Sequence, residues 1–162
     1  MRTDERGPVI DARARELIGT VTFTWTSEPV SLRQVREYVA ATGGRPEQWG
    51  DPGDPHAPVP TPPLFFHAAC RPVVALADLL EDGQYPFLGV PGVRGRSMAG
   101  GQSYEILAPV RVGDVLTVRE RLSSLSEKQG RSGPLVITET ESEYTNGDDV
   151  LVARFRQTVI FR

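Results

Sequence analysis

The sequence predicts an α+β fold in which an antiparallel sheet wraps around a single apolar helix. Three observations support this prediction. After residue 101, four runs of alternating polar and apolar residues are separated only by turn residues, a pattern typical of antiparallel strands. The stretch Leu64–Leu80 is apolar on nearly all sides, which indicates a buried helix. One strand and one amphipathic helix precede that stretch, so the sheet can enclose it.

Length, cysteine usage and charge limit the classes of protein. The 162 residues suffice to bury a sizeable core. We expect residues 1–19 to form an N-terminal segment with a short helix over Val9–Leu17, and residues 20–162 to form one domain. Cys70 is the only cysteine, so no internal disulfide is predicted.

The charge pattern and the start of the chain exclude further classes. The formal net charge is −3 with both signs interspersed, so the chain lacks a basic surface for nucleic acid. No apolar run is long enough to cross a membrane. The opening MRTDERG lacks the apolar segment of a signal peptide, and we therefore expect a cytoplasmic protein.

The first half of the chain carries two well-marked elements and a long loop. Thr20–Thr26 alternates strictly between apolar residues and threonines, which predicts a half-buried strand. Ser31 and Gln34 have the spacing of a capping box, and Gly43 suits the C-terminal end of the helix that follows. The segment Gly43–Pro63 holds seven prolines and is predicted to be a surface loop.

The order of the remaining elements defines the fold. The apolar helix is predicted to break near Arg71 and Pro72, because proline interrupts helical hydrogen bonding. A loop over Gly83–Arg96 and the flexible pair Gly100 and Gly101 lead into the strands. These are expected at Gln102–Val110, Val115–Leu125, Leu135–Thr145 and Val150–Phe161. A sheet with this order wrapped around an apolar helix is the arrangement called a hot-dog fold.

Three stretches carry a resemblance to a known family. They are PVPTPPLFFHA at Pro58–Ala68, RSMAGGQSYEILAPVRVGDVLTV at Arg96–Val118, and SEKQGRSGPLVITETESEYTN at Ser126–Asn146. In these stretches the chain resembles the N-terminal half of the MaoC-like, FAS1-type hydroxyacyl-thioester dehydratases. Together with the last strand, the resemblance covers the chain from Val30 to its C-terminus.

The resemblance implies an activity and a catalytic motif. The reaction is the reversible dehydration of a 3-hydroxyacyl thioester, on coenzyme A or an acyl carrier protein, to the enoyl thioester. The resemblance implies no cofactor. In the active half of such enzymes, an Asp and a His in a D-x-N-P-x-H motif hold one water and relay its proton. Backbone N–H groups at the start of the buried helix bind the enolate oxygen.

This chain departs from that motif. The corresponding residues are GRPEQW, with Gly44 in place of the aspartate and Trp49 in place of the histidine, and neither can relay a proton. Pro62 and Pro63 also remove two backbone donors at the start of the buried helix. The resemblance therefore implies a non-catalytic, substrate-shaping half that pairs with a hot-dog unit carrying the Asp and His.

Three residues remain as catalytic candidates. Asp51 and His56 have the D-x-x-x-x-H spacing, but they lie in a proline-rich segment without the Asn-Pro core. His67 lies on the apolar helix, where a buried, hydrogen-bonded structural histidine is the simpler interpretation. Cys70 lies on the same helix without an activating base and is interpreted as a core residue.

The candidates for substrate binding surround the glycine pair. Arginines in the preceding loop can pair with the phosphates of coenzyme A or of a phosphopantetheine arm. Tyr104 and its neighbour Glu105 must face opposite sides of their strand, so at most one of them faces a cleft. No spacing of residues suggests a metal site. The binding candidates are Arg94, Arg96, Gly100, Gly101 and Tyr104.

Three hypotheses for the function stay open. The first is a non-catalytic hydratase/dehydratase subunit that forms a homodimer or a heteromer with a catalytic MaoC-like subunit, because one unit leaves its sheet edge uncovered. The second is a stand-alone homodimeric hydro-lyase that uses His56 with Asp51, or His67. The third is an acyl-thioester binding protein without chemistry. The acyl chain, its carrier and the pathway are not determined by the sequence.

Overall fold

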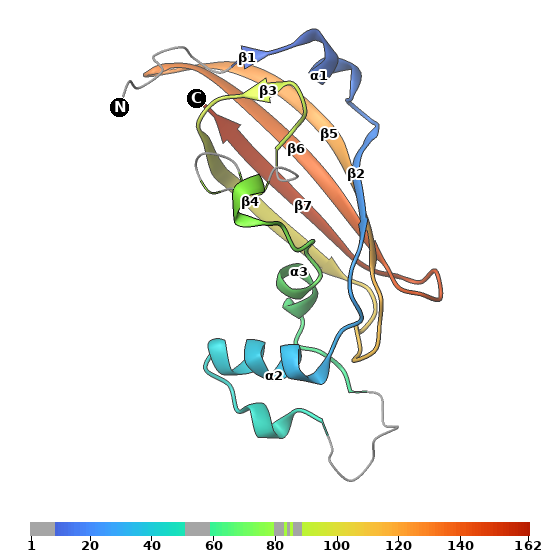
Figure 1. Ribbon diagram of the computed structural model, residues 1–162. Helices are drawn as coiled ribbons and strands as arrows, with labels where there is room; N and C mark the ends of the chain where they lie inside the picture. Colours follow the sequence, from blue (N-terminus) through green and yellow to red (C-terminus); the bar gives the residue numbers. More distant parts are fainter. Residues whose placement is uncertain (1–8, 51–58, 80–82, 84, 86–88) are drawn as a thin grey trace.

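The computed structural model describes residues 9–50, 59–79, 83, 85 and 89–162, and one antiparallel sheet organises it (Figure 1). Its five strands lie in the order β2-β5-β6-β7-β4, so β2 and β4 form the two edges. An edge strand leaves one side of its backbone unpaired within the sheet. The strands are β2 (Val21–Thr26), β4 (Ser97–Ile106), β5 (Thr117–Gly130), β6 (Gly133–Thr145) and β7 (Leu151–Phe161).

Side-chain alternation gives the sheet an inner and an outer face. The inner face is the one that carries Val118 and Leu122 of β5, Tyr144 of β6 and Phe155 of β7, all of which are buried. The outer face carries charged side chains such as the exposed Arg119. Within the described ranges, the inner face is therefore the one that other parts of the chain cover.

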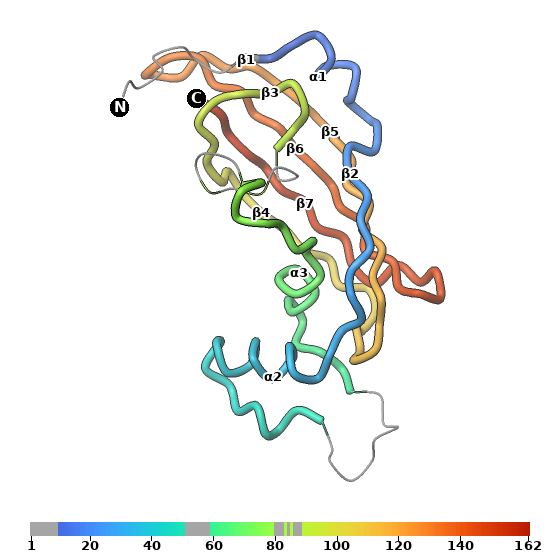
Figure 2. Tube along the Cα trace, viewed as in Figure 1, coloured from blue at the N-terminus to red at the C-terminus, as the bar shows by residue number. Residues whose placement is uncertain are grey.

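Apolar side chains on the inner face form two separate clusters, one toward each end of the sheet. The first cluster packs helices α2 (Leu32–Ala41) and α3 (Phe65–Ala69) against β5, β6 and β7. The second cluster packs helix α1 (Ala12–Glu16) against Leu122 and Phe161. Figure 2 shows α1 and α2 at opposite ends of the molecule, at the top and the bottom of the view. The middle of the inner face lies between these two clusters.

Helix α2 forms as predicted. The Oγ of Ser31 accepts a hydrogen bond from the N–H of Gln34 at 3.2 Å, and the Gln34 side chain accepts one from the N–H of Ser31 at 2.9 Å. Gly43, with φ of +81°, follows the end of the helix. Val35 and Val39 are its buried residues, so α2 contributes its apolar side to the first cluster.

Replacing Ser31 with alanine is expected to lower the free energy of unfolding by about 1 kcal/mol, because the N–H of Gln34 loses its acceptor. Urea unfolding followed by circular dichroism measures the difference. Ser31→Asp keeps an acceptor and should stay within roughly half a kcal/mol of the wild type. A Ser31→Ala variant as stable as the wild type would show that the capping box contributes nothing.

The apolar helix is shorter than predicted. Helix α3 ends at Ala69, which confirms the predicted break near Arg71 and Pro72, but only a separate 3-10 turn, η2 (Leu76–Asp78), follows, so the prediction of an α-helix that resumes after the break is wrong. Leu80 itself lies outside the described residues. Pro72 explains the early end, because proline lacks an N–H and disfavours helical geometry at the preceding residue. Val73 is 97% exposed and Leu76 is 86% exposed, so the chain after the break does not enter the core.

Strand β4 begins and ends earlier than predicted. It runs from Ser97 to Ile106, so Gly100 and Gly101 lie inside the strand, where its register against β7 shifts. A Cβ atom on Gly100 would lie 3.2 Å from the carbonyl oxygen of Thr158. Glycine therefore permits a close approach of β4 to β7, a role that differs from the predicted flexible lead into the strand.

The hairpin of β5 and β6 extends further toward its turn than the alternation of polar and apolar residues predicted. Strand β5 begins at Thr117 rather than Val115 and continues to Gly130 instead of stopping at Leu125. Its last residues are polar and mostly exposed, so they show no alternation of polar and apolar residues that would predict a strand. Their backbones nevertheless pair with β6 up to Gly133. Backbone pairing therefore extends beyond the part of the hairpin that covers the core.

The N-terminal segment forms a helix shorter than the expected Val9–Leu17, because Val9 and Ile10 form a strand and α1 covers only Ala12–Glu16. The Oδ1 of Asp11 accepts a hydrogen bond from the N–H of Ala14 at 2.9 Å and caps α1. Just before it, β1 (Val9–Ile10) pairs with β3 (Val93–Arg94) in a second, two-stranded sheet. Within the described ranges, no helix has the length and apolar character needed to cross a membrane.

Candidate functional site

His67 is the centre of a polar cluster where α3 meets the inner face. Its Nε2 lies 2.7 Å from Nη2 of Arg71, and its Nδ1 lies 3.3 Å from the phenolic oxygen of Tyr144. A guanidinium group can only donate, so Nε2 is the acceptor and the ring proton lies on Nδ1. Nδ1 then donates to the phenolic oxygen of Tyr144.

The cluster contains one formal charge. Burial, and after it the charge of Arg71, lower the pKa of His67 to about 4, so the imidazole is neutral at neutral pH. Burial raises the pKa values of Tyr144 and Tyr104, and the charge of Arg71 opposes both increases. Among these four side chains, only Arg71 is therefore ionised.

Aromatic rings of the sheet hold His67 in place. The centroid of its ring lies 4.4 Å from that of Phe155 and 5.3 Å from that of Tyr104. Tyr104 and Phe155 are paired residues on β4 and β7, and their rings stack at 4.8 Å. The Tyr104 hydroxyl donates to the side-chain oxygen of Gln102 at 3.3 Å. Tyr104 thus joins the cluster from the inner face.

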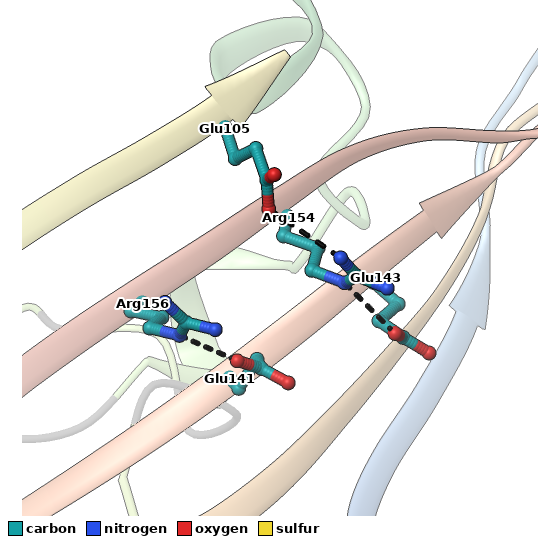
Figure 3. Close-up of polar contacts among 5 residues, drawn as sticks. All are labelled: Glu105, Glu141, Glu143, Arg154 and Arg156. Carbon is teal, nitrogen blue, oxygen red and sulfur yellow. Dashed lines mark hydrogen bonds and ion pairs between the residues drawn. The ribbon is translucent and has the colours of Figure 1, made fainter. Parts of the chain in front are cut away.

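The outer face of the same strands carries paired charges. Arg154 lies between Glu105 and Glu143, at 3.4 and 3.2 Å, and Arg156 pairs with Glu141 at 2.5 Å (Figure 3). The prediction that Glu105 and Tyr104 face opposite sides is confirmed. Solvent-exposed ion pairs of this kind contribute little to stability, so we interpret these pairs as part of the solvated surface.

A buried carboxyl group lies on the inner face near the cluster. Glu120 of β5 is 6% exposed and faces Ser142 of β6, whose Oγ donates to Glu120 Oε2 at 3.3 Å. Burial raises the pKa of Glu120 to about 7, and the hydrogen bond from Ser142 opposes the increase. Thr138 and Thr140 of β6 are buried as well. The middle of the inner face is therefore polar, between two apolar clusters.

An apolar cavity adjoins the free edge of the sheet. It has a volume of about 350 Å³ and lies between the start of α3 and the end of β4, with Pro62, Phe66, Ile106 and Leu107 among its lining residues. Ile106 and Leu107 are large apolar side chains that remain exposed. The cavity therefore offers apolar surface next to the edge strand β4.

Of the predicted binding residues, the structure places only Tyr104 against His67. Arg94 pairs with Val9 across β1 and β3, and the backbone of Arg96 is bonded to that of Arg162. Ser97, the residue after Arg96, begins β4, and Tyr104 lies seven residues farther along the strand, or about 23 Å. The two arginines are thus at the opposite end of β4 from the cluster.

The other predicted site residues divide into two groups. Asp51 and His56 lie outside the described residues. Cys70 belongs to the first apolar cluster, which confirms its interpretation as a core residue, and burial raises its pKa to about 11. In the part of the chain that the structure describes, no group of three or more His, Cys, Asp or Glu side chains is placed to hold a metal ion.

Three residues of the site were not predicted from the sequence. Arg71 was predicted only to lie near the break in the apolar helix. Glu120 had a signal, because it falls between Val118 and Leu122 on the apolar side of its strand's alternation. Tyr144 meets His67 across 77 positions of sequence, a contact that no local pattern indicates.

The fold defines a class of protein. An antiparallel five-stranded sheet that encloses an apolar helix is the hot-dog fold of the MaoC-like dehydratases. The ChsH1-ChsH2 complex from Mycobacterium tuberculosis is similar with a TM-score of 0.63 and 14% identity, over 93% of this chain and 91% of that chain. The C-terminally truncated HadBC (3R-hydroxyacyl-ACP dehydratase) complex from the same organism has a TM-score of 0.57 and 21% identity, over 99% of each chain.

A MaoC-like dehydratase from Rhodospirillum rubrum has a TM-score of 0.56 and 17% identity, over 88% of this chain and 93% of that chain. The model of the FAS1-like dehydratase domain region matches residues 16–155. The chain belongs to this family of dehydratase domains. No curated protein sequence matches it.

Proposed function

We propose that the chain is the non-catalytic, substrate-shaping subunit of a hydratase/dehydratase that acts on 3-hydroxyacyl and enoyl thioesters. The observation that carries this proposal is the state of His67. Its Nε2 lone pair accepts a hydrogen bond from Arg71, and its pKa is about 4. A general base for water at neutral pH needs an accessible lone pair and a pKa closer to 7. His67 has neither property.

The second partner of His67 also argues against a proton relay. The side-chain hydrogen bonds of His67 go to Arg71 and Tyr144, and neither is a carboxylate. Gly44 and Trp49 occupy the positions where the family's motif has its Asp and His. The catalytic pair is therefore assigned to a second hot-dog unit.

Two features support a partner and an acyl substrate. Among the described strands, β4 forms an edge of the sheet and carries exposed apolar side chains, including Met98 and Ile106, which suits it to pairing with a strand of another unit. The apolar cavity at the start of α3 leaves room for an acyl chain. The similar ChsH1-ChsH2 and HadBC structures are complexes, which agrees with a two-unit assembly.

A hydration assay tests the proposal. The purified chain is mixed with crotonyl-coenzyme A and longer enoyl thioesters, and loss of the conjugated enoyl absorbance is followed. We expect no turnover from the chain alone, and turnover when a hot-dog chain with the D-x-N-P-x-H motif is co-purified with it. Replacing the histidine of that motif should abolish the activity.

Turnover by the chain alone would contradict the proposal and favour a stand-alone hydro-lyase. Asp51→Asn, His56→Ala and His67→Gln would then locate its catalytic group. A folded chain that binds enoyl thioesters, but gives no turnover with any partner bearing the motif, would favour a thioester-binding protein.

A further inference from the structure

Strand β4 lies along one border of the sheet and is exposed over most of its length (Figure 1). Of its ten residues, only Ser97 and Tyr104 are partly buried. Two of the exposed side chains are large and apolar, since Met98 is 43% exposed and Ile106 is 47% exposed. A long edge strand with exposed apolar side chains is a template for pairing with a strand of another chain.

Opposite charges mark the two ends of this strand on the outer face of the sheet. Glu105, near the end of β4, is its only charged residue and lies on that face. Ile160 shares the outer face with Arg154 by the alternation of β7, and Met98 is paired with Ile160. Arg96, two residues before Met98, is exposed and lies on the same face. Two copies of β4 placed antiparallel would therefore bring each arginine near the glutamate of the other copy.

The bulge at Gly100 limits the register of such a pair. One extra residue is inserted in β4 relative to β7, between Ala99 and Gly101. The outer face therefore carries even-numbered residues up to Gly100 and odd-numbered residues from Gly101 onward. Residues that face each other across antiparallel strands share a face of the sheet. Two copies of β4 paired along their whole length must therefore match residues whose numbers add to an odd number.

Charge complementarity favours one of these registers. It places Arg96 of each copy opposite Glu105 of the other, and it places Met98 opposite Ser103. A shift of two residues in one direction would put Glu105 opposite Met98. The same shift in the other direction would put Arg96 opposite Ser103. Both shifts leave the charges without counterparts, whereas the favoured register forms two opposite-charge pairs related by the twofold axis.

The backbone of β4 agrees with this register. Arg96 exchanges two backbone hydrogen bonds, at 2.9 and 3.0 Å, with the residue that follows β7, and the N–H of Leu107 also donates to β7. Outer-face residues of β4 thus direct their backbone groups toward β7, and inner-face residues direct theirs toward the edge. In the favoured register the inner-face residues Ala99 and Gln102 face each other and can exchange two hydrogen bonds. Arg96 and Glu105 then form a non-hydrogen-bonded pair, in which side chains lie closer together.

We propose that β4 is a homodimer interface at which it pairs antiparallel with β4 of a second copy of this chain, with Arg96 of each copy opposite Glu105 of the other. This inference goes beyond the proposed function, because it concerns the chain without a catalytic partner. The catalytic unit is assigned to the same edge, so the two assemblies exclude each other.

Cysteine cross-linking of the purified full chain tests the register. Met98→Cys with Ser103→Cys places thiols directly opposite each other, at a Cα separation suited to a disulfide. We expect a covalent dimer on a non-reducing gel after mild oxidation. Met98→Cys with Glu105→Cys is the control for the shifted register, and it should remain monomeric on the gel, as should each single variant. The native Cys70 is 2% exposed, so it does not compete.

Charge reversal gives a second test that needs no added cysteine. Sedimentation equilibrium measures the dissociation constant of the dimer, and Glu105→Arg should raise it about tenfold, because two attractive contacts become repulsive. Combining Glu105→Arg with Arg96→Glu restores both pairs and should restore most of the affinity. Glu143→Arg is the matched control, since Glu143 pairs with the same Arg154 but lies on β6, away from the edge. Unfolding midpoints identify any variant that fails to fold.

The outcomes separate this inference from the proposed function. A chain that stays monomeric at the highest concentration measured overturns the interface, and cross-linking of the shifted pair alone overturns the register. Equal dissociation constants for the wild type and Glu105→Arg would overturn the role of the charges. In these cases partner-dependent hydration still tests the proposed function. A homodimer with the expected cross-link, but without partner-dependent hydration, would overturn only the proposed function.

Discussion

Replacing Phe66 with alanine is expected to lower the free energy of unfolding by about 3–5 kcal/mol, because the change leaves a cavity in a close-packed core. Phe66 is 1% exposed, and its ring meets that of Tyr144 edge to face with centroids 4.8 Å apart. Helix α3 has only five residues, so tertiary packing must hold it in place. The loss should therefore include much of the contact between α3 and the sheet.

Urea unfolding of both proteins measures this effect, and the thermal midpoint should fall by roughly 2–4 °C for each kcal/mol. Leu64→Ala is the matched control, since Leu64 lies at the start of the same helix but is 43% exposed. We expect it to cost less than about 1 kcal/mol. Equal losses for the two variants would show that burial against Tyr144 does not stabilise α3.

Glu120→Gln is expected to stabilise the protein above pH 7, by up to about 3 kcal/mol, and to have little effect near pH 4.5. The folded protein holds the carboxyl at a pKa of about 7, above the ordinary value of 4.5, chiefly because of burial. Between these two pH values the folded state binds more protons at this site than the unfolded state. The contribution of Glu120 to stability is therefore present at low pH and is lost as pH rises through 7.

Unfolding free energies of wild type and variant at several pH values between 4.5 and 8 measure the effect. Glutamine keeps an oxygen that accepts the hydrogen bond of Ser142, so the comparison isolates the charge. His67 contributes in the opposite direction, because its lowered pKa favours folding as pH rises from about 4 to 6.5, but this contribution is the same in both proteins. Glu139→Gln, which alters an exposed carboxyl group on β6, is the control. If the unfolding free energies of wild type and Glu120→Gln changed with pH in parallel, the raised pKa of Glu120 would be disproved.

Much of the fold could be predicted because its signals are local. The alternation in β2, β6 and β7, the capping box at Ser31 and the break at Pro72 each depend on neighbouring residues, and each is found in the structure. The bounds of β4 and β5 were predicted less well. In the sequence, Gly100 suggests a flexible lead into a strand, and only the position of β7 shows that glycine allows the two strands to approach closely. At the end of β5 the residues are polar, so no pattern indicates that their backbone is paired with β6.

The candidate site was predicted only in part for the same reason. His67 and Tyr104 were singled out, but the sequence does not show that His67 is neutral and bonded to Arg71 and Tyr144. Those properties depend on burial and on contacts between α3 and β6, which only the folded chain brings together. The predicted arginines, Arg94 and Arg96, lie elsewhere because the register of β4 carries them to the other end of the strand.

The sequence by itself determined the antiparallel sheet, the capped helix α2 and the identities of Gly44 and Trp49, neither of which can relay a proton. These features follow from short-range periodicity, capping chemistry and residue identity. The tertiary structure decided the ionisation of His67 and Glu120 and the setting of Arg71. Proton affinity and charge compensation depend on desolvation and on partners distant in sequence, and folding alone creates both.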